Sequence, residues 1–153
     1  MAEAELVVDL TAKFARFAED CSRFSREVAR FASVASPRDP DENAQMNLRI
    51  ARTVFSKWSV DLIAILYTNR FVGVQEIRKS LEGISSRVLS LKLKQLESLG
   101  LIQRAVLQTR PPRVQYSLTD KGRRVAKLGE PVFLYLRFTE GLLREVADVP
   151  HGP

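Results

Sequence analysis

Polar and basic side chains recur at helical spacing between Ile84 and Leu99, and their chemistry suits contact with a polyanion. On a helix of 3.6 residues per turn, one face carries mostly polar groups and the other carries leucines. The polar face holds Arg87, Ser90, Leu91, Lys94 and Ser98, and the apolar face holds Leu89, Leu93 and Leu96. Arginine can pair bidentately with a base edge, and lysine can neutralise a phosphate. The segment therefore predicts a helix with one core face and one face that reads nucleic acid.

A second basic group lies in a proline-rich loop between two short segments of extended character. The loop contains Thr109, Arg110, Pro111, Pro112 and Arg113. Residues 101–106 and 114–118 have a period near two, which predicts a two-stranded ribbon. Prolines stiffen a loop and cannot donate ladder hydrogen bonds, so the tip should stand clear of the sheet. An ordinary solvated hairpin loop is the alternative, but the adjoining reading helix favours a basic finger.

Capping residues bound the reading helix and place another helix before it. Ser85 or Ser86 can accept hydrogen bonds from the free amides of the first turn, and Gly100 suits the left-handed residue that ends a helix. Residues 74–81 predict a short helix, and the link at residues 82–83 completes a helix-turn-helix.

The remaining elements should frame this motif. Residues 39–55 resemble a capping box followed by a helix, and residues 58–67 are apolar nearly all round, which predicts a buried central helix. Residues 69–73 should turn the chain. After the ribbon, Thr119 should cap a helix and Pro131 should open another.

Apolar residues also recur at alternating steps of three and four before residue 36. They are Val7, Leu10, Phe14, Phe17, Cys21, Phe24, Val28 and Phe31. A heptad seam of this length predicts a helix that pairs with a partner surface. Four seam phenylalanines favour pairing between two subunits, and packing within the chain is the alternative. The apolar position of Cys21 favours a small packing residue over a redox switch. In a last helix over residues 132–146, Tyr135 and Leu142 lie on an apolar side that can join this arm.

The positive charge is concentrated in the middle of the chain. The net charge of +6 divides into −3 for residues 1–42, +10 for residues 43–130 and −1 for residues 131–153. A basic surface can serve only to keep a small domain in solution, but its concentration around the reading helix favours double-stranded nucleic acid.

Several other classes of protein are disfavoured by what the sequence contains. The single histidine, His151, lies at the C-terminal end, and the single cysteine lies on the packing seam, so we expect no catalysis, metal site or cofactor. No apolar run reaches membrane-spanning length. The N-terminal segment has acidic residues where a secretion signal needs lysines, so we expect a cytoplasmic protein that has no membrane partner.

Motifs in the basic segment identify a resemblance to a known family. They are Lys57-Trp58, Gly83-Ile84-Ser85, Arg87-Val88-Leu89-Ser90, Gly100-Leu101-Ile102, Pro111-Pro112-Arg113-Val114 and Tyr116-Ser117-Leu118-Thr119. In this order, over about residues 45–130, the chain resembles HxlR-type regulators, relatives of the MarR group. The resemblance implies a homodimeric winged-helix transcription regulator of bacteria or archaea. It implies major-groove contacts by Ser86, Arg87, Ser90, Leu91 and Lys94, and backbone or minor-groove contacts by Arg110 and Arg113. Ser85 at the start of the helix and Thr109 in the loop are predicted to contact DNA as well.

The chain departs from the family pattern in three places. Some members sense oxidants or aldehydes through a cysteine near the motif at Lys57-Trp58, and this chain has none there. The family usually has a polar or basic residue where Leu91 stands, so Leu91 either contacts a thymine methyl group or is covered by a neighbour. The N-terminal heptad segment is longer than usual, which suggests a dimer interface particular to this branch.

Together these patterns predict a mainly α-helical fold with a small β-hairpin. Residues 1–36 should form a dimerisation arm, residues 37–130 a winged helix-turn-helix domain and residues 131–153 a second dimerisation helix with a frayed tail. The predicted function is a homodimeric regulator that binds specific double-stranded DNA. A DNA-coating protein of low sequence preference and a winged-helix module that binds protein are the alternatives. The sequence identifies no small-molecule effector.

Overall fold

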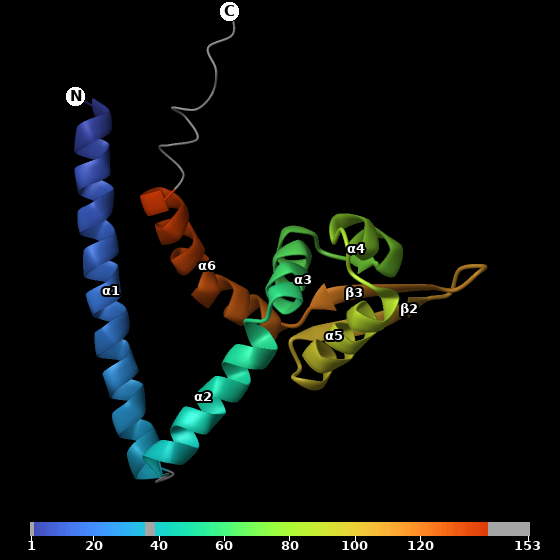
Figure 1. Cartoon of the computed structure of the whole chain (residues 1–153), viewed down its shortest axis with the longest axis horizontal. Helices are drawn as coiled ribbons and strands as arrows, with labels where there is room; N and C mark the ends of the chain where they lie inside the picture. The colour runs from blue at the N-terminus through green and yellow to red at the C-terminus, as the bar shows by residue number, and fades with distance from the viewer. Residues whose placement is uncertain (1, 36–38, 141–153) are drawn as a thin grey trace, which may run out of the picture. The chain divides into compact units, whose positions relative to one another are not determined.

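The computed structural model describes residues 2–35 and 39–140, and its elements run from α1 to α6 with three short strands between the helices (Figure 1). Helices dominate and the sheet is small, which confirms the predicted fold class. The chain forms two compact units, residues 1–46 and 47–153. The boundaries expected near residues 36 and 130, between the dimerisation arm, the winged helix-turn-helix domain and the second dimerisation helix, stay predictions.

The first unit contains one long helix and the beginning of a second. Helix α1 spans Ala2–Ala35, which confirms the helix expected from the heptad pattern. Its seam residues Phe17, Cys21, Phe24, Val28 and Phe31 are exposed in the single chain, whereas Leu10 and Phe14 are half-buried. Helix α2 spans Pro40–Val54. The carboxylate of Asp39 accepts a hydrogen bond from the backbone amide of Asp41 at 3.3 Å, as expected at the start of a helix.

The core of the second unit forms where three helices pack on a sheet. Helix α3 spans Lys57–Thr68, α4 spans Val74–Ser80 and α5 spans Ser86–Ser98. The largest fully buried side chains of the core are leucines and isoleucines from all three helices and from the sheet: Leu62, Ile77, Leu89, Leu96, Ile102 and Leu118. The predicted central helix is therefore confirmed as α3, with Leu62 and Leu66 buried against its neighbours.

The sheet has three strands where the sequence predicted two. Strands β2 (Ile102–Leu107) and β3 (Arg113–Leu118) form the expected antiparallel hairpin. The segment at residues 69–73 also contributes strand β1 (Val72–Gly73), which pairs with β3 on its other side. The prediction of a simple turn was wrong there, because two residues are too few to show a strand period.

Helix α6 spans Asp120–Glu140 without interruption and contains Pro131. The expectation that Pro131 opens a new helix was therefore wrong. Proline removes one backbone hydrogen bond, and here the carbonyl freed is that of Lys127, an exposed residue that water can reach. The expected start is confirmed, because the amide of Gly122 donates to the hydroxyl of Thr119 at 3.0 Å. Residues 141–146 of the predicted last helix, Leu142 among them, lie outside the described residues.

Candidate nucleic-acid interface

Helix α5 has the two faces that its sequence predicted. Leu89, Leu93 and Leu96 are buried in the core. The opposite side is exposed and carries Ser86, Arg87, Ser90, Leu91, Lys94 and Ser98. Because the leucines hold the helix on α3 and the sheet, the polar side faces solvent along its length. The structure therefore brings all the predicted reading residues of α5 onto one surface, which we call the reading face.

Both ends of α5 are fixed by local hydrogen bonds. At the start, the hydroxyl of Ser85 accepts from the amide of Val88 at 3.2 Å, so Ser85 is the N-cap and Ser86 the first helical residue. At the end, Gly100 has a φ of 71°, a left-handed conformation that favours glycine. The amide of Gly100 bonds to the carbonyl of Glu97 and that of Leu101 to Leu96, which is the Schellman arrangement.

Hydrogen bonds from two lysines tie α5 to the rest of the domain. The ammonium of Lys92 donates to the hydroxyl of Ser56 at 3.1 Å, and Ser56 donates to the fully buried Ser59 at 2.9 Å. At the C-cap of α5, the ammonium of Lys121 donates to the carbonyl of Leu99 at 2.7 Å. Sequence reasoning did not identify either contact, because the partners are 36 and 22 residues apart and no local pattern links them.

The start of α6 packs tightly against the end of α5. A side chain at Gly122 would overlap the backbone carbonyl of Leu101, so this close approach requires glycine. Thr119 donates from its backbone amide to the same carbonyl at 3.0 Å. The junction of Thr119, Lys121 and Gly122 therefore sets the position of the C-terminal end of α5.

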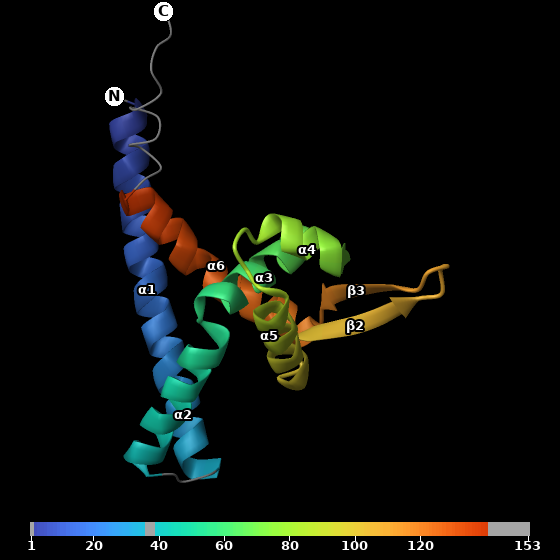
Figure 2. The same cartoon turned by 45° about the vertical axis from the view of Figure 1, so that its right-hand side comes forward.

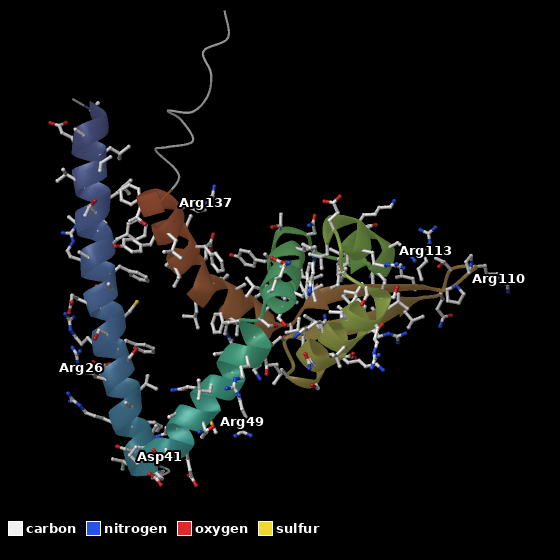
Figure 3. The ribbon with its side chains drawn as sticks, viewed as in Figure 1. Arg26, Asp41, Arg49, Arg110, Arg113 and Arg137 are labelled. Carbon is white, nitrogen blue, oxygen red and sulfur yellow. The ribbon has the colours of Figure 1, made fainter. Side chains whose placement is uncertain are left out.

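The hairpin β2–β3 extends away from the helices in both Figure 1 and Figure 2 and forms a wing. Its tip is closed by a hydrogen bond of 2.9 Å from the hydroxyl of Thr109 to the carbonyl of Pro111. Arg110 lies at the tip, and Arg113 lies nearer the domain at the start of β3, opposite Leu107 (Figure 3). Both arginines are exposed, as expected of a basic finger.

Within residues 2–35 and 39–140, the ion pairs join Lys13 to Asp9, Arg23 to Asp20 and Arg123 to Asp120. None of them involves a cation of the reading face or the wing, so those cations remain available to an anionic partner. The Arg123 guanidinium, which bonds to Asp120 at 2.9 Å, lowers the pKa of that carboxyl. Further exposed basic residues of the domain were not singled out from the sequence, among them Arg78, Lys79 and Arg104.

The residues predicted to mediate dimerisation fall in both units. Leu10, Phe14, Phe17, Cys21, Phe24, Val28 and Phe31 lie on α1, and Tyr135 lies on α6. Within the part of the chain that the structure describes, no helix is long and apolar enough to cross a membrane. In the same residues, no group of three or more histidine, cysteine or acidic side chains could hold a metal ion.

Comparison with known proteins places this architecture in a family. The model of the HxlR-like helix-turn-helix family matches residues 53–133, which run from the end of α2 into α6. The chain is similar to the uncharacterised HTH-type transcriptional regulator YvaP of Bacillus subtilis (strain 168), with 44% identity over 78 residues. That match covers 50% of this chain and 72% of YvaP.

Two further similarities agree with this match. The uncharacterised HTH-type transcriptional regulator sll1512 of Synechocystis is 41% identical over 71 residues, which cover 46% of this chain and about half (51%) of that relative. The crystal structure of a putative MarR-family transcriptional regulator from Porphyromonas gingivalis W83 has a TM-score of 0.52 and 31% identity. It covers 62% of this chain and 91% of that one. The resemblance seen in the sequence is confirmed, and the chain belongs to the HxlR-like helix-turn-helix family.

Proposed function

We propose that the protein is a transcription regulator that binds a specific double-stranded DNA sequence as a homodimer. The observation that carries this proposal is the two-faced helix α5. Its leucines are buried, its ends are capped, and its exposed side presents Arg87 and Lys94, neither of which takes part in an ion pair among the described residues. A rigid helix with such a face suits the major groove of B-form DNA.

Each element of the interface has a distinct proposed role. Arg87, in the first turn of α5, contacts a base edge, most favourably the two acceptors of a guanine. Ser86 and Ser90 lie on the same face and approach neighbouring bases or phosphates. Lys94, about two turns along, contacts a phosphate, as do Arg110 and Arg113 of the wing, which can also enter a narrow minor groove.

Dimerisation follows from the apolar residues that the single chain leaves exposed. On α1, Phe17, Phe24 and Phe31 are exposed, and on α6 Val132 and Tyr135 are exposed. A second copy that covers these faces gives a two-fold symmetric protein with two reading helices. The matching operator is palindromic, with half-sites about one helical turn apart. We place the protein in the cytoplasm, where the DNA of bacteria and archaea is found.

Selection of binding sites from randomised duplexes tests the proposal with three forms of the full-length protein. Wild type should select a palindrome. Arg87→Ala should lose preference at one position in each half-site, because a bidentate arginine contact discriminates between bases by about 1–3 kcal/mol. Lys94→Ala should select the same palindrome with lower affinity.

The control is Lys127→Ala, which removes an exposed cation from α6 and should change neither site nor affinity. If wild type selects no palindrome and binds all duplexes alike, the protein is a DNA-coating protein of low sequence preference. If it binds no duplex, the winged helix is a protein-binding module. If Arg87→Ala selects the wild-type site with unchanged stringency, Arg87 does not read a base.

A further inference from the structure

One apolar side chain interrupts the cationic reading face. Leu91 is 53% exposed, so the alternative that a neighbouring element covers it does not hold for the single chain. On a helix of 3.6 residues per turn it lies almost opposite the buried Leu89, Leu93 and Leu96. It is therefore at the centre of the exposed side. Arg87 lies one turn before it and Lys94 one turn after it.

The cations on either side restrict what can cover Leu91. Neither Arg87 nor Lys94 has an acidic partner among the ion pairs of the described residues. A protein surface that docks through hydrophobic contact needs a contiguous apolar patch of several hundred square ångströms. Leu91 is instead the one large hydrophobic residue exposed between Ser86 and Ser98. The partner must therefore be anionic overall and offer a small apolar group between its charges.

Double-stranded DNA offers one such group in the major groove, the C5 methyl group of thymine. We infer that Leu91 contacts a thymine methyl group in each half-site and selects thymine at that position. This inference rests on the proposed function, since it requires the reading face to lie in the major groove. It adds a specificity determinant that acts through apolar contact, one helical turn from the guanine contact proposed for Arg87.

Replacement of thymine by deoxyuridine tests the contact, because deoxyuridine lacks only the C5 methyl group and pairs in the same way. We would substitute each thymine of the selected operator in turn and measure the affinity of full-length wild type, Leu91→Ala and Leu48→Ala. Leu48 on α2 is a matched control, because it is also an exposed leucine but lies outside the reading face and outside the residues proposed for dimerisation. Neither substitution removes a buried side chain, so all three proteins should fold alike, which thermal unfolding checks.

We expect one thymine position per half-site to be sensitive in wild type. Removal of one methyl group should weaken binding about fourfold, the equivalent of about 0.8 kcal/mol, and removal from both half-sites about fifteenfold. Leu48→Ala should show the same sensitivity, whereas Leu91→Ala should bind thymine and deoxyuridine operators equally. The sensitive thymine can also be replaced by cytosine or by 5-methylcytosine, each paired with guanine. Wild type should bind the 5-methylcytosine operator more tightly than the cytosine operator.

The outcomes separate this inference from the function on which it rests. If wild type selects a palindrome but no deoxyuridine changes its affinity, the Leu91 contact is refuted and the regulator proposal stands. The contact is also refuted if Leu91→Ala keeps the wild-type sensitivity. If wild type selects no operator, both proposals fail together.

Discussion

Helices α5 and α1 differ in how much of their apolar faces is buried. In α5 the leucines lie in the core of the domain, and the polar and cationic side is exposed. In α1 the apolar residues Phe17, Phe24 and Phe31 are exposed. The apolar face of α5 is thus buried within its domain, whereas these three phenylalanines of α1 are exposed. The difference supports the proposal that α5 contacts DNA and that the exposed phenylalanines of α1 contact a second copy of the chain.

The two helices should therefore respond to different conditions. Contacts between cations and phosphates weaken as salt increases, because the release of counterions from the polyanion into a concentrated solution is less favourable. Burial of aromatic side chains has no such dependence on moderate salt. Binding to DNA and pairing of subunits can thus be measured as separable events.

Negative charge placed on the heptad seam of α1 should have the largest effect, which is to weaken the dimer. Phe17→Asp with Phe24→Asp removes four aromatic side chains from a symmetric interface, each worth about 1.5–3 kcal/mol when buried. The dimer should weaken by at least about four orders of magnitude. Sedimentation velocity over a range of concentrations measures the change.

The control places the same charges on the opposite side of α1. Ala15→Asp with Ser33→Asp changes two exposed residues that lie away from the seam, and the dimer should persist. A double seam variant that sediments like wild type would mean that the exposed phenylalanines are not the interface.

Removal of the wing arginines should have a smaller effect that depends on salt. Arg110→Ala with Arg113→Ala removes the side chains that bind up to four phosphates in a dimer. The slope of log affinity against log salt should decrease by about 0.9 for each phosphate that is no longer neutralised, and all duplexes should be affected similarly. Titrations of operator DNA at several salt concentrations give the slope.

Two exposed arginines of α1, changed together as Arg16→Ala and Arg30→Ala, provide a control that removes the same amount of charge. They should leave the slope close to that of wild type, since they are outside the wing and reading face. An unchanged slope in the wing variant would show that the wing points away from DNA.

The smallest expected effect is a difference in stability between variants of two lysines on the same helix. Lys92 is half-buried and bonds to Ser56, whereas Lys94 is exposed. Lys92→Met should lower the free energy of unfolding by about 1 kcal/mol, the net value of such a hydrogen bond at a partly exposed site. Lys94→Met should change stability by less than about 0.5 kcal/mol but weaken DNA binding.

Denaturant unfolding and operator titration measure the two effects on the same samples. Equal stability of Lys92→Met and wild type would show that the contact with Ser56 does not hold α5. Equal operator affinity of Lys94→Met and wild type would show that Lys94 does not contact DNA.

The parts of the fold that the sequence predicted are those that depend on local periodicity and on capping residues. The faces of α5 follow from the spacing of Leu89, Leu93 and Leu96, and its ends follow from Ser85 and Gly100. These features depend on residues within a few turns of one another, so a single sequence contains them.

The features that the sequence did not predict depend on distant residues or on exceptions to local preference. Strand β1 has only two residues and exists because β3 offers it a partner. The contact from Lys92 to Ser56 requires the packing of α5 on the start of α3. Pro131 lies inside a helix because the turns on both sides supply enough hydrogen bonds.

The junction at Thr119, Lys121 and Gly122 also connects the position of α6 to that of the reading helix. The 21 residues of α6 extend about 30 Å from the point where α5 ends, at about 1.5 Å per residue. Lys121 bonds to the carbonyl of Leu99, the C-cap of the reading helix, so we expect a tilt of α6 to be transmitted to that end of the helix. By lever geometry, a displacement of about 3 Å at the far end of α6 corresponds to a rotation of about 6° at the junction. If α6 contributes to the proposed dimer interface, its angle would then help to set the distance between the two reading helices and the spacing of half-sites that they fit.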